Sequence, residues 1–98
     1  MVKKHQIVTL SSGKMLELPK GIRKEDILDL ELEEHEILLD LKMYGRRTRR
    51  YYLYHHMDLS LLRRLKSRGF VVSVKLNSGY AYDLSHTSIV LMQHGLVG

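Results

Sequence analysis

Residues 58–84, DLSLLRRLKSRGFVVSVKLNSGYAYDL, decide the fold class, because they predict one amphipathic helix followed by a β-hairpin. Asp58 is a good N-cap, since its carboxylate can accept hydrogen bonds from the first turn of a helix over residues 58–68. Gly69 favours the left-handed conformation that ends many helices. Three leucines form the stripe that this helix would bury: Leu61, Leu62 and Leu65. A helix this short needs packing to be stable, so we expect a sheet beneath it.

Short strands joined by glycine turns surround this helix. Residues 70–76 and 80–84 predict a hairpin closed by a turn at residues 77–79, because glycine supplies the positive φ that tight turns need. The same Ser-Gly turn chemistry joins two predicted strands near the N-terminus, residues 5–10 and 14–18.

The middle of the chain predicts a third hairpin. Residues 36–44 alternate between apolar and polar positions, which is typical of a half-buried strand. Gly45 would turn the chain, residues 46–50 would form the tip, and residues 50–56 would return as the second strand.

Three further segments complete the expected fold. Residues 21–30 predict a short helix, although the alternation of Leu28, Leu30 and Leu32 also fits a strand. Residues 89–92 predict a short apolar strand, and residues 94–98 are expected to fray unless they dock on a partner. The whole chain, residues 1–98, therefore predicts a single α+β domain: a small, mostly antiparallel sheet of five to seven short strands built from hairpins, with helix 58–68 packed on it.

Four arginines in five residues make the predicted tip the strongest candidate for a binding site: Arg46, Arg47, Arg49 and Arg50. Guanidinium groups are permanently charged forks that match two phosphate oxygens at once. Tyr52 and Tyr54 follow the tip and could stack on unpaired bases or pack in the fold. Arg64 and Arg68 share a helix face and could extend the basic surface, although cations in a last helical turn also complement the helix dipole. We therefore expect contact with nucleic acid, either DNA or RNA.

The charge of the chain is separated into two blocks. Residues 25–40 hold eight acidic and no Lys or Arg residues, whereas residues 42–68 hold nine basic residues and one acidic residue. A positive block of this kind favours a polyanionic partner. The alternative is a protein–protein assembly module in which the acidic (25–40) and basic (42–68) blocks pair within the fold or between subunits. A homodimer is expected in either case, because the core of so small a chain stabilises it only modestly.

One N-terminal stretch resembles a known family. Residues 8–23, VTLSSGKMLELPKGIR, and above all the Leu-Pro-Lys-x-Ile-Arg element that ends at Arg23, look like the opening of AbrB/MazE-type swapped-hairpin DNA-binding proteins. The resemblance implies an intertwined dimer that binds DNA through its N-terminal half. The Leu-Gly-Leu and Gly-Asp elements expected after Arg23 in that family are missing.

Several other functions are not indicated. The serines lie in no nucleophile-elbow context, and there is no phosphate-binding glycine loop, so we expect no enzymatic activity and no catalytic residues. The histidine spacings match no zinc pattern and there is no cysteine, so no metal and no cofactor are expected. No apolar run approaches the roughly 18 residues of a membrane span. We therefore expect a cytoplasmic (intracellular) protein without a membrane partner.

Overall fold

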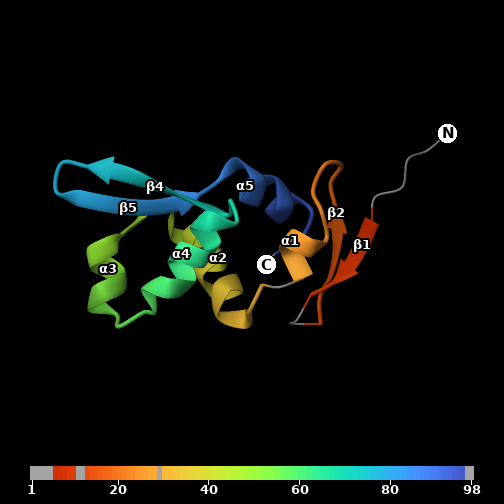
Figure 1. Cartoon of the computed structure of the whole chain (residues 1–98), viewed down its shortest axis with the longest axis horizontal. Helices are drawn as coiled ribbons and strands as arrows, with labels where there is room; N and C mark the ends of the chain where they lie inside the picture. Colours follow the sequence, from red (N-terminus) through yellow and green to blue (C-terminus); the bar gives the residue numbers. More distant parts are fainter. Residues whose placement is uncertain (1–5, 11–12, 29, 97–98) are drawn as a thin grey trace.

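The computed structural model describes residues 6–10, 13–28 and 30–96. It confirms the predicted α+β class, with two small antiparallel sheets and several helices (Figure 1). The elements in chain order are β1 (Gln6–Thr9), β2 (Met15–Leu18), α1 (Glu25–Leu28), α2 (Leu32–Tyr44), β3 (Arg47–Thr48), α3 (Arg49–Tyr54), α4 (Leu59–Ser67), β4 (Val71–Leu76), β5 (Gly79–Leu84) and α5 (His86–Gln93).

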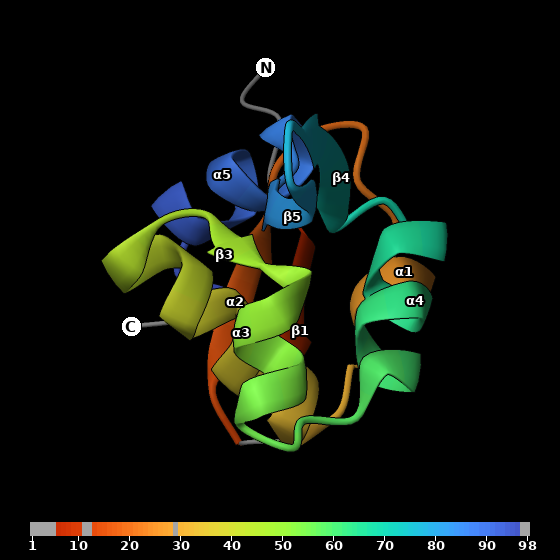
Figure 2. The same cartoon turned by 90° about the vertical axis from the view of Figure 1, so that its left-hand side faces the viewer.

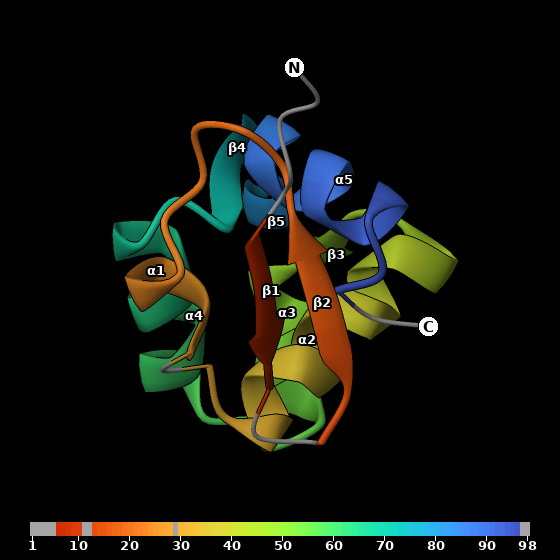
Figure 3. The ribbon, with the colours of Figure 1, turned by 90° about the vertical axis from the view of Figure 1, so that its right-hand side faces the viewer.

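The two sheets lie at opposite ends of an elongated molecule of 52 × 24 × 22 Å. At one end, β1 and β2 form a hairpin (foreground of Figure 3) in which Gln6 pairs with Leu18. At the other end, the strand order is β3-β5-β4, and the β4–β5 hairpin projects beyond the body of the protein. We call this hairpin, residues 71–84, the wing. Its tight turn requires Gly79, which has a φ of +140°.

The helix predicted over residues 58–68 is confirmed as α4. Asp58 caps it, because its Oδ1 accepts the Ser60 N–H at 2.9 Å. Gly69 follows the helix with a φ of +83°, as the sequence predicted. The predicted N-terminal hairpin and the wing are confirmed where the structure describes them. Residue 5 and the turn residues 11 and 12 lie outside the described part of the chain. Of the helix predicted over residues 21–30, the structure forms the four residues of α1.

The strand predicted over residues 36–44 is wrong, because these residues belong to helix α2. Ile37, Leu38 and Leu41 are all buried on one side of the helix. In a strand, Leu38 would point away from Ile37 and Leu41. The sequence did not decide between helix and strand here, because the consecutive apolar residues 37–39 fit the repeat of either structure. A capping box starts the helix, in which the Glu31 N–H donates to Glu34 Oε1 at 3.1 Å.

The predicted β-hairpin with an arginine tip is also wrong. Residues 50–56 do not return as a strand, because residues 49–54 form helix α3. Thr48 caps this helix, and its Oγ1 accepts the Tyr51 N–H at 3.1 Å. The tertiary fold therefore overrides the preference of tyrosine for strands. Arg46–Arg50 forms the connection from α2 through β3 into α3 instead of a loop tip.

The C-terminal segment differs from the prediction in the same way. The strand predicted over residues 89–92 lies inside helix α5, which Ser85 caps by accepting the Ser88 N–H at 3.2 Å. Leu96 is buried, and its N–H donates to the Leu91 carbonyl at 3.0 Å, so residues 94–96 dock on this chain instead of fraying. Residues 97 and 98 lie outside the described part.

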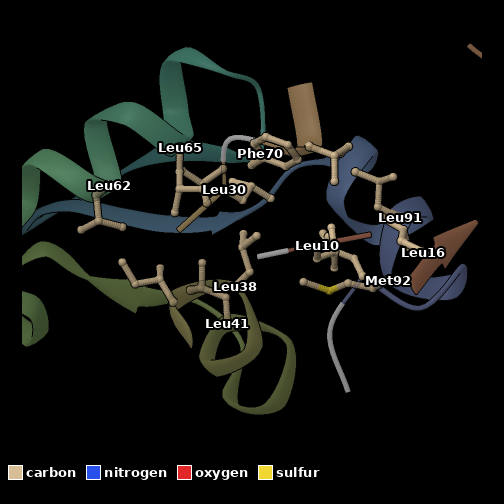
Figure 4. Close-up of a cluster of buried hydrophobic side chains, with 14 of the residues drawn as sticks. Leu10, Leu16, Leu30, Leu38, Leu41, Leu62, Leu65, Phe70, Leu91 and Met92 are labelled. Carbon is tan, nitrogen blue, oxygen red and sulfur yellow. The ribbon is translucent and has the colours of Figure 1, made fainter. Parts of the chain in front are cut away.

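One hydrophobic core connects both ends of the molecule. Leu38 and Leu41 of α2 face Leu62 and Leu65 of α4 in its centre (Figure 4). The cluster continues through Phe70, Leu91 and Met92 to the N-terminal hairpin, from which Val8, Leu10, Leu16 and Leu18 contribute. This core fixes α4, α3 and the wing relative to one another, because all three connect to its buried side chains.

Candidate nucleic-acid interface

Arg47 is tied to neighbouring elements of the fold and is partly exposed. Its Nε lies 2.9 Å from Asp40 Oδ2, and its Nη2 donates to Asp40 Oδ1 at 3.1 Å, so the pair is bidentate. The hydrogen bond from this side chain to Asp40 raises the pKa of Arg47 above its usual range. The guanidinium also lies 4.9 Å from the ring centre of Tyr44 and 4.1 Å from that of Tyr51. Arg47 therefore ties β3 and α3 to α2, and it is not available to grip phosphate.

Arg64 has a similar structural role on α4. Its Nη1 lies 3.1 Å from Glu31 Oε1 and 3.2 Å from Glu34 Oε1. The Glu34 side chain is completely buried, at 0% exposure, so Arg64 is the counter-charge of a buried carboxylate. Arg68 is partly buried, with its Nη1 enclosed by protein. The two helix arginines that the sequence offered as an extension of the basic surface are thus placed toward α2 and the body of the protein.

These contacts pair acidic and basic blocks inside one chain. Asp40 and Glu31 come from the acidic block, whereas Arg47 and Arg64 come from the basic block. Arg46, whose side chain is 47% exposed, makes a longer contact with a residue outside both blocks: its Nε lies 3.7 Å from Asp83 Oδ2. Part of the charge separation seen in the sequence is therefore satisfied within the protein.

Arg49 and Arg50 remain exposed at the start of α3. Neither forms an ion pair with a carboxylate anywhere in the described ranges. Positive side chains in a first helical turn face the positive end of the helix dipole, so the stability of α3 does not account for them. Arg49 and Arg50 are therefore open to an external anion.

The two predicted tyrosines have opposite environments. Tyr52 is only 1% exposed and belongs to the core, where its ring meets that of Tyr82 edge-on at 5.9 Å. Burial raises the pKa of Tyr52 above its ordinary value, so its phenol stays protonated. Tyr52 packs and does not stack on bases. Tyr54, by contrast, is exposed on α3, with its ring beside that of His55.

The outward face of α4 carries residues that were not among the predicted site residues. Ser60, Arg63, Lys66 and Ser67 are exposed at spacings that place them on one side of the helix. Within the described ranges, neither Arg63 nor Lys66 forms an ion pair. Hydrogen bonds from Ser60 hold the pKa of Asp58 below its usual range, and the charge of Arg63 adds to this. The apolar stripe of the sequence could have identified this face, because it lies opposite Leu62 and Leu65.

A hollow connects this face of α4 to the start of α3. It has a volume of about 280 Å³ and is lined by Arg49, Leu59, Arg63 and Tyr82. Arg49 also lines a larger groove beneath the wing, so it stands between α4 and the wing. The hollow thus joins Arg49 of α3 to Arg63 of α4. We call the exposed cations of these two helices the basic face: Arg49, Arg50, Arg63 and Lys66 (α3 and α4 are seen together in Figure 2).

Other kinds of site find no support in the part of the chain that the structure describes. Among residues 6–10, 13–28 and 30–96, no three His, Asp or Glu side chains gather as metal ligands would. No helix in those same ranges is long and apolar enough to cross a membrane.

Comparison of the chain with protein-family models, with curated proteins and with solved structures gave no match. The N-terminal segment that resembles AbrB/MazE-type proteins folds as β1 and β2, which pair with each other within one chain and pack on its core.

Proposed function

We propose that this protein is a small non-enzymatic nucleic-acid-binding protein of regulatory or accessory function, and that its target is duplex DNA. The observation that carries the proposal is the succession of α3, a four-residue turn and α4, with exposed cations on both helices. The proposal rests on architecture and on residue chemistry.

The connection between α3 and α4 has the form that a helix-turn-helix requires. Residues 55–58 make a four-residue turn between the two helices. His56 adopts a left-handed φ of +56°, the conformation that glycine often supplies in such turns. In DNA-binding proteins of this architecture, the second helix enters the major groove and the first crosses the backbone. Here, α4 is the second helix, and its outward face carries Arg63 and Lys66.

The wing adds a second element beside the helices. β4 and β5 follow α4 directly, and their hairpin projects above α3 (Figure 1). Lys75 and Tyr80 pair across the two strands and are both exposed. A projecting hairpin next to a groove-binding helix can follow the DNA backbone, and its cation adds to the phosphate contacts. The order of α2, β3, α3, α4 and the wing is that of a winged helix-turn-helix.

The test is a fluorescence-anisotropy titration with duplex DNA, single-stranded DNA and RNA at several salt concentrations. Arg63→Gln/Lys66→Gln should weaken duplex binding and flatten the slope of log K against log salt by about 2, since each phosphate contact contributes about 0.9. The matched control is Lys20→Gln/Lys24→Gln, which removes the same charge from exposed residues outside the basic face. Equal losses in both variants, or no binding by the wild-type protein, would sink the proposal.

A homodimer in the cytoplasm forms part of the same proposal. DNA-binding helix-turn-helix proteins commonly bind as dimers on paired half-sites. An apolar groove of about 430 Å³ lies between α2 and α5, lined by Leu41, Leu84, Ile89 and Met92 with Lys42 and Gln93. A second copy covering the exposed Ile89 would bury apolar surface on both subunits.

The alternative is an assembly module that oligomerises through its acidic and basic blocks. The exposed acids Glu33 and Glu36 of α2 favour this possibility, because no ion pair with a described residue satisfies them. Light scattering across salt concentrations separates the two functions. Oligomers that dissociate in salt, together with no affinity for nucleic acid, would support the assembly module.

A further inference from the structure

A groove of about 550 Å³ lies between α3 and the wing. The α3 side is lined by Thr48, Arg49, Arg50 and Leu53, and the wing side by Leu76, Ser78, Gly79 and Tyr80. Figures 1 and 2 show the wing running above α3, the two elements whose residues line the groove. The volume falls within the roughly 300–1,000 Å³ of typical small-molecule sites.

The lining combines two kinds of chemistry. Arg49 and Arg50 supply two guanidinium groups that no carboxylate of the described chain neutralises. Leu53 and Tyr80, which are 53% and 50% exposed, supply an apolar and an aromatic surface in the same groove. The Ser78 hydroxyl adds a neutral hydrogen-bonding group. A ligand that fills this groove needs an anionic part and a flat apolar part.

The stability of α3 does not explain its two arginines. The arginines oppose the helix dipole of α3, and each costs a little stability there. Tyr80 lies near the wing turn, and its half-exposed ring leaves apolar surface in contact with water. Small polar side chains would serve the helix start better, so the two arginines, beside the exposed ring of Tyr80, indicate a binding role.

We propose that this groove binds one nucleoside phosphate, with the phosphate between Arg49 and Arg50 and the base against Tyr80 and Leu53. Forked guanidinium groups match phosphate oxygens, and an aromatic ring accepts the face of any base. The nucleoside phosphate is either a free nucleotide or an unpaired nucleotide at the end of a strand. Only the second source rests on the proposed function in nucleic-acid binding.

The first experiment is isothermal titration of the full chain with the four nucleoside monophosphates at low salt. Inorganic phosphate and adenosine are titrated separately, as the two halves of adenosine monophosphate. The expected result is that adenosine monophosphate binds at least about tenfold more tightly than either half, since phosphate and base contacts act together. Equal affinity for phosphate and nucleotide would overturn the proposal and leave an anion site only.

Substitutions test which residues bind the phosphate and which bind the base. Arg49→Gln/Arg50→Gln should abolish the nucleotide affinity. Tyr80→Leu retains an apolar side chain but removes the aromatic ring, and it should weaken binding about tenfold. Tyr54→Ala is the control, because it removes an exposed tyrosine of α3 that does not line the groove. Circular dichroism checks that each variant is folded. If Tyr80→Leu and Tyr54→Ala have equal effects, the groove assignment is wrong.

The second experiment identifies the source of the nucleotide. A blunt DNA duplex is compared with the same duplex carrying one unpaired terminal nucleotide. Tighter binding of the overhang, lost in Tyr80→Leu, identifies a strand end; nucleotide binding without an overhang preference identifies a free nucleotide. Blunt-duplex binding with neither of these effects would overturn the groove proposal and leave the proposed function intact. Nucleotide binding without duplex binding would overturn the proposed function and leave the groove proposal intact.

Discussion

Replacement of Arg64 by methionine tests whether this cation stabilises the fold instead of binding a ligand. Arg64 Nη1 contacts Glu31 Oε1 at 3.1 Å and Glu34 Oε1 at 3.2 Å. Glu34 is fully buried, and its other oxygen, Oε2, has no hydrogen-bond partner in the described chain. Loss of Arg64 would leave a buried carboxylate without its counter-charge, and α4 would lose its ionic link to α2.

The expected loss of stability follows from this geometry. Removal of one partner from a buried ion pair costs about 3–5 kcal/mol. The Arg64 side chain is itself 33% exposed, so water can screen Glu34 after the substitution, and we take the lower end, about 3 kcal/mol. Methionine keeps much of the aliphatic stem, so lost packing adds little. For a domain of this size the change should lower Tm by at least about 12 °C.

The assay is urea unfolding at pH 7, followed by far-ultraviolet circular dichroism, on a double-mutant cycle. Glu34→Gln keeps an acceptor for the Glu31 N–H but removes the buried charge. On this background, Arg64→Met should cost only about 1 kcal/mol, which leaves a coupling energy of about 2 kcal/mol. Arg63→Met, on the exposed face of the same helix, is the control and should change stability by less than about 0.5 kcal/mol.

Two results would refute this reasoning. One is an equal cost of Arg64→Met with and without Glu34→Gln, because the two side chains would then be energetically independent. The other is a strong loss of DNA binding in Arg64→Met at unchanged stability, which would return Arg64 to the binding surface.

Three further predictions concern other parts of the molecule. Tyr52→Phe removes a buried hydroxyl that has no hydrogen-bond partner in the described chain, so it should leave the free energy of unfolding unchanged or raise it by about 1 kcal/mol in urea titrations; a loss above that amount would reveal a partner. Burial holds the pKa of His35 below 6.5, so as the pH falls below that value the unfolded chain takes up a proton that the folded protein does not, and the free energy of unfolding falls. His35→Gln should therefore lose less stability than the wild type between pH 7.5 and 5.5. An equal loss in both proteins would contradict this. Ile89→Glu should shift the protein toward monomer in sedimentation velocity, whereas Thr87→Glu, an exposed control on α5, should not; a wild-type monomer would rule out the dimer.

The candidate site was only partly predictable from the sequence. The density of arginines at residues 46–50 pointed to an anion-binding region, and Arg49 and Arg50 remain in it. Arg47 could not be separated from them by any local pattern, because its partner Asp40 becomes its neighbour only when α2 and β3 meet. Tyr80 reaches the same groove from 30 residues further along the chain, through the pairing of β4 with β5.

Local signals in the sequence determined the α+β class, α4, the wing and the N-terminal hairpin. An aspartate cap, glycine turns and leucine spacing act within a few residues, so they do not depend on distant contacts. Tertiary structure alone decided that residues 36–44 and 49–54 are helical, since their apolar residues fit both helix and strand until a core selects one face. Tertiary structure also decided which cations pair with carboxylates within the fold and which face solvent. Arg64 meets Glu31 across 33 positions of the chain, whereas Arg63 beside it faces water, because the core fixes which side of α4 is buried.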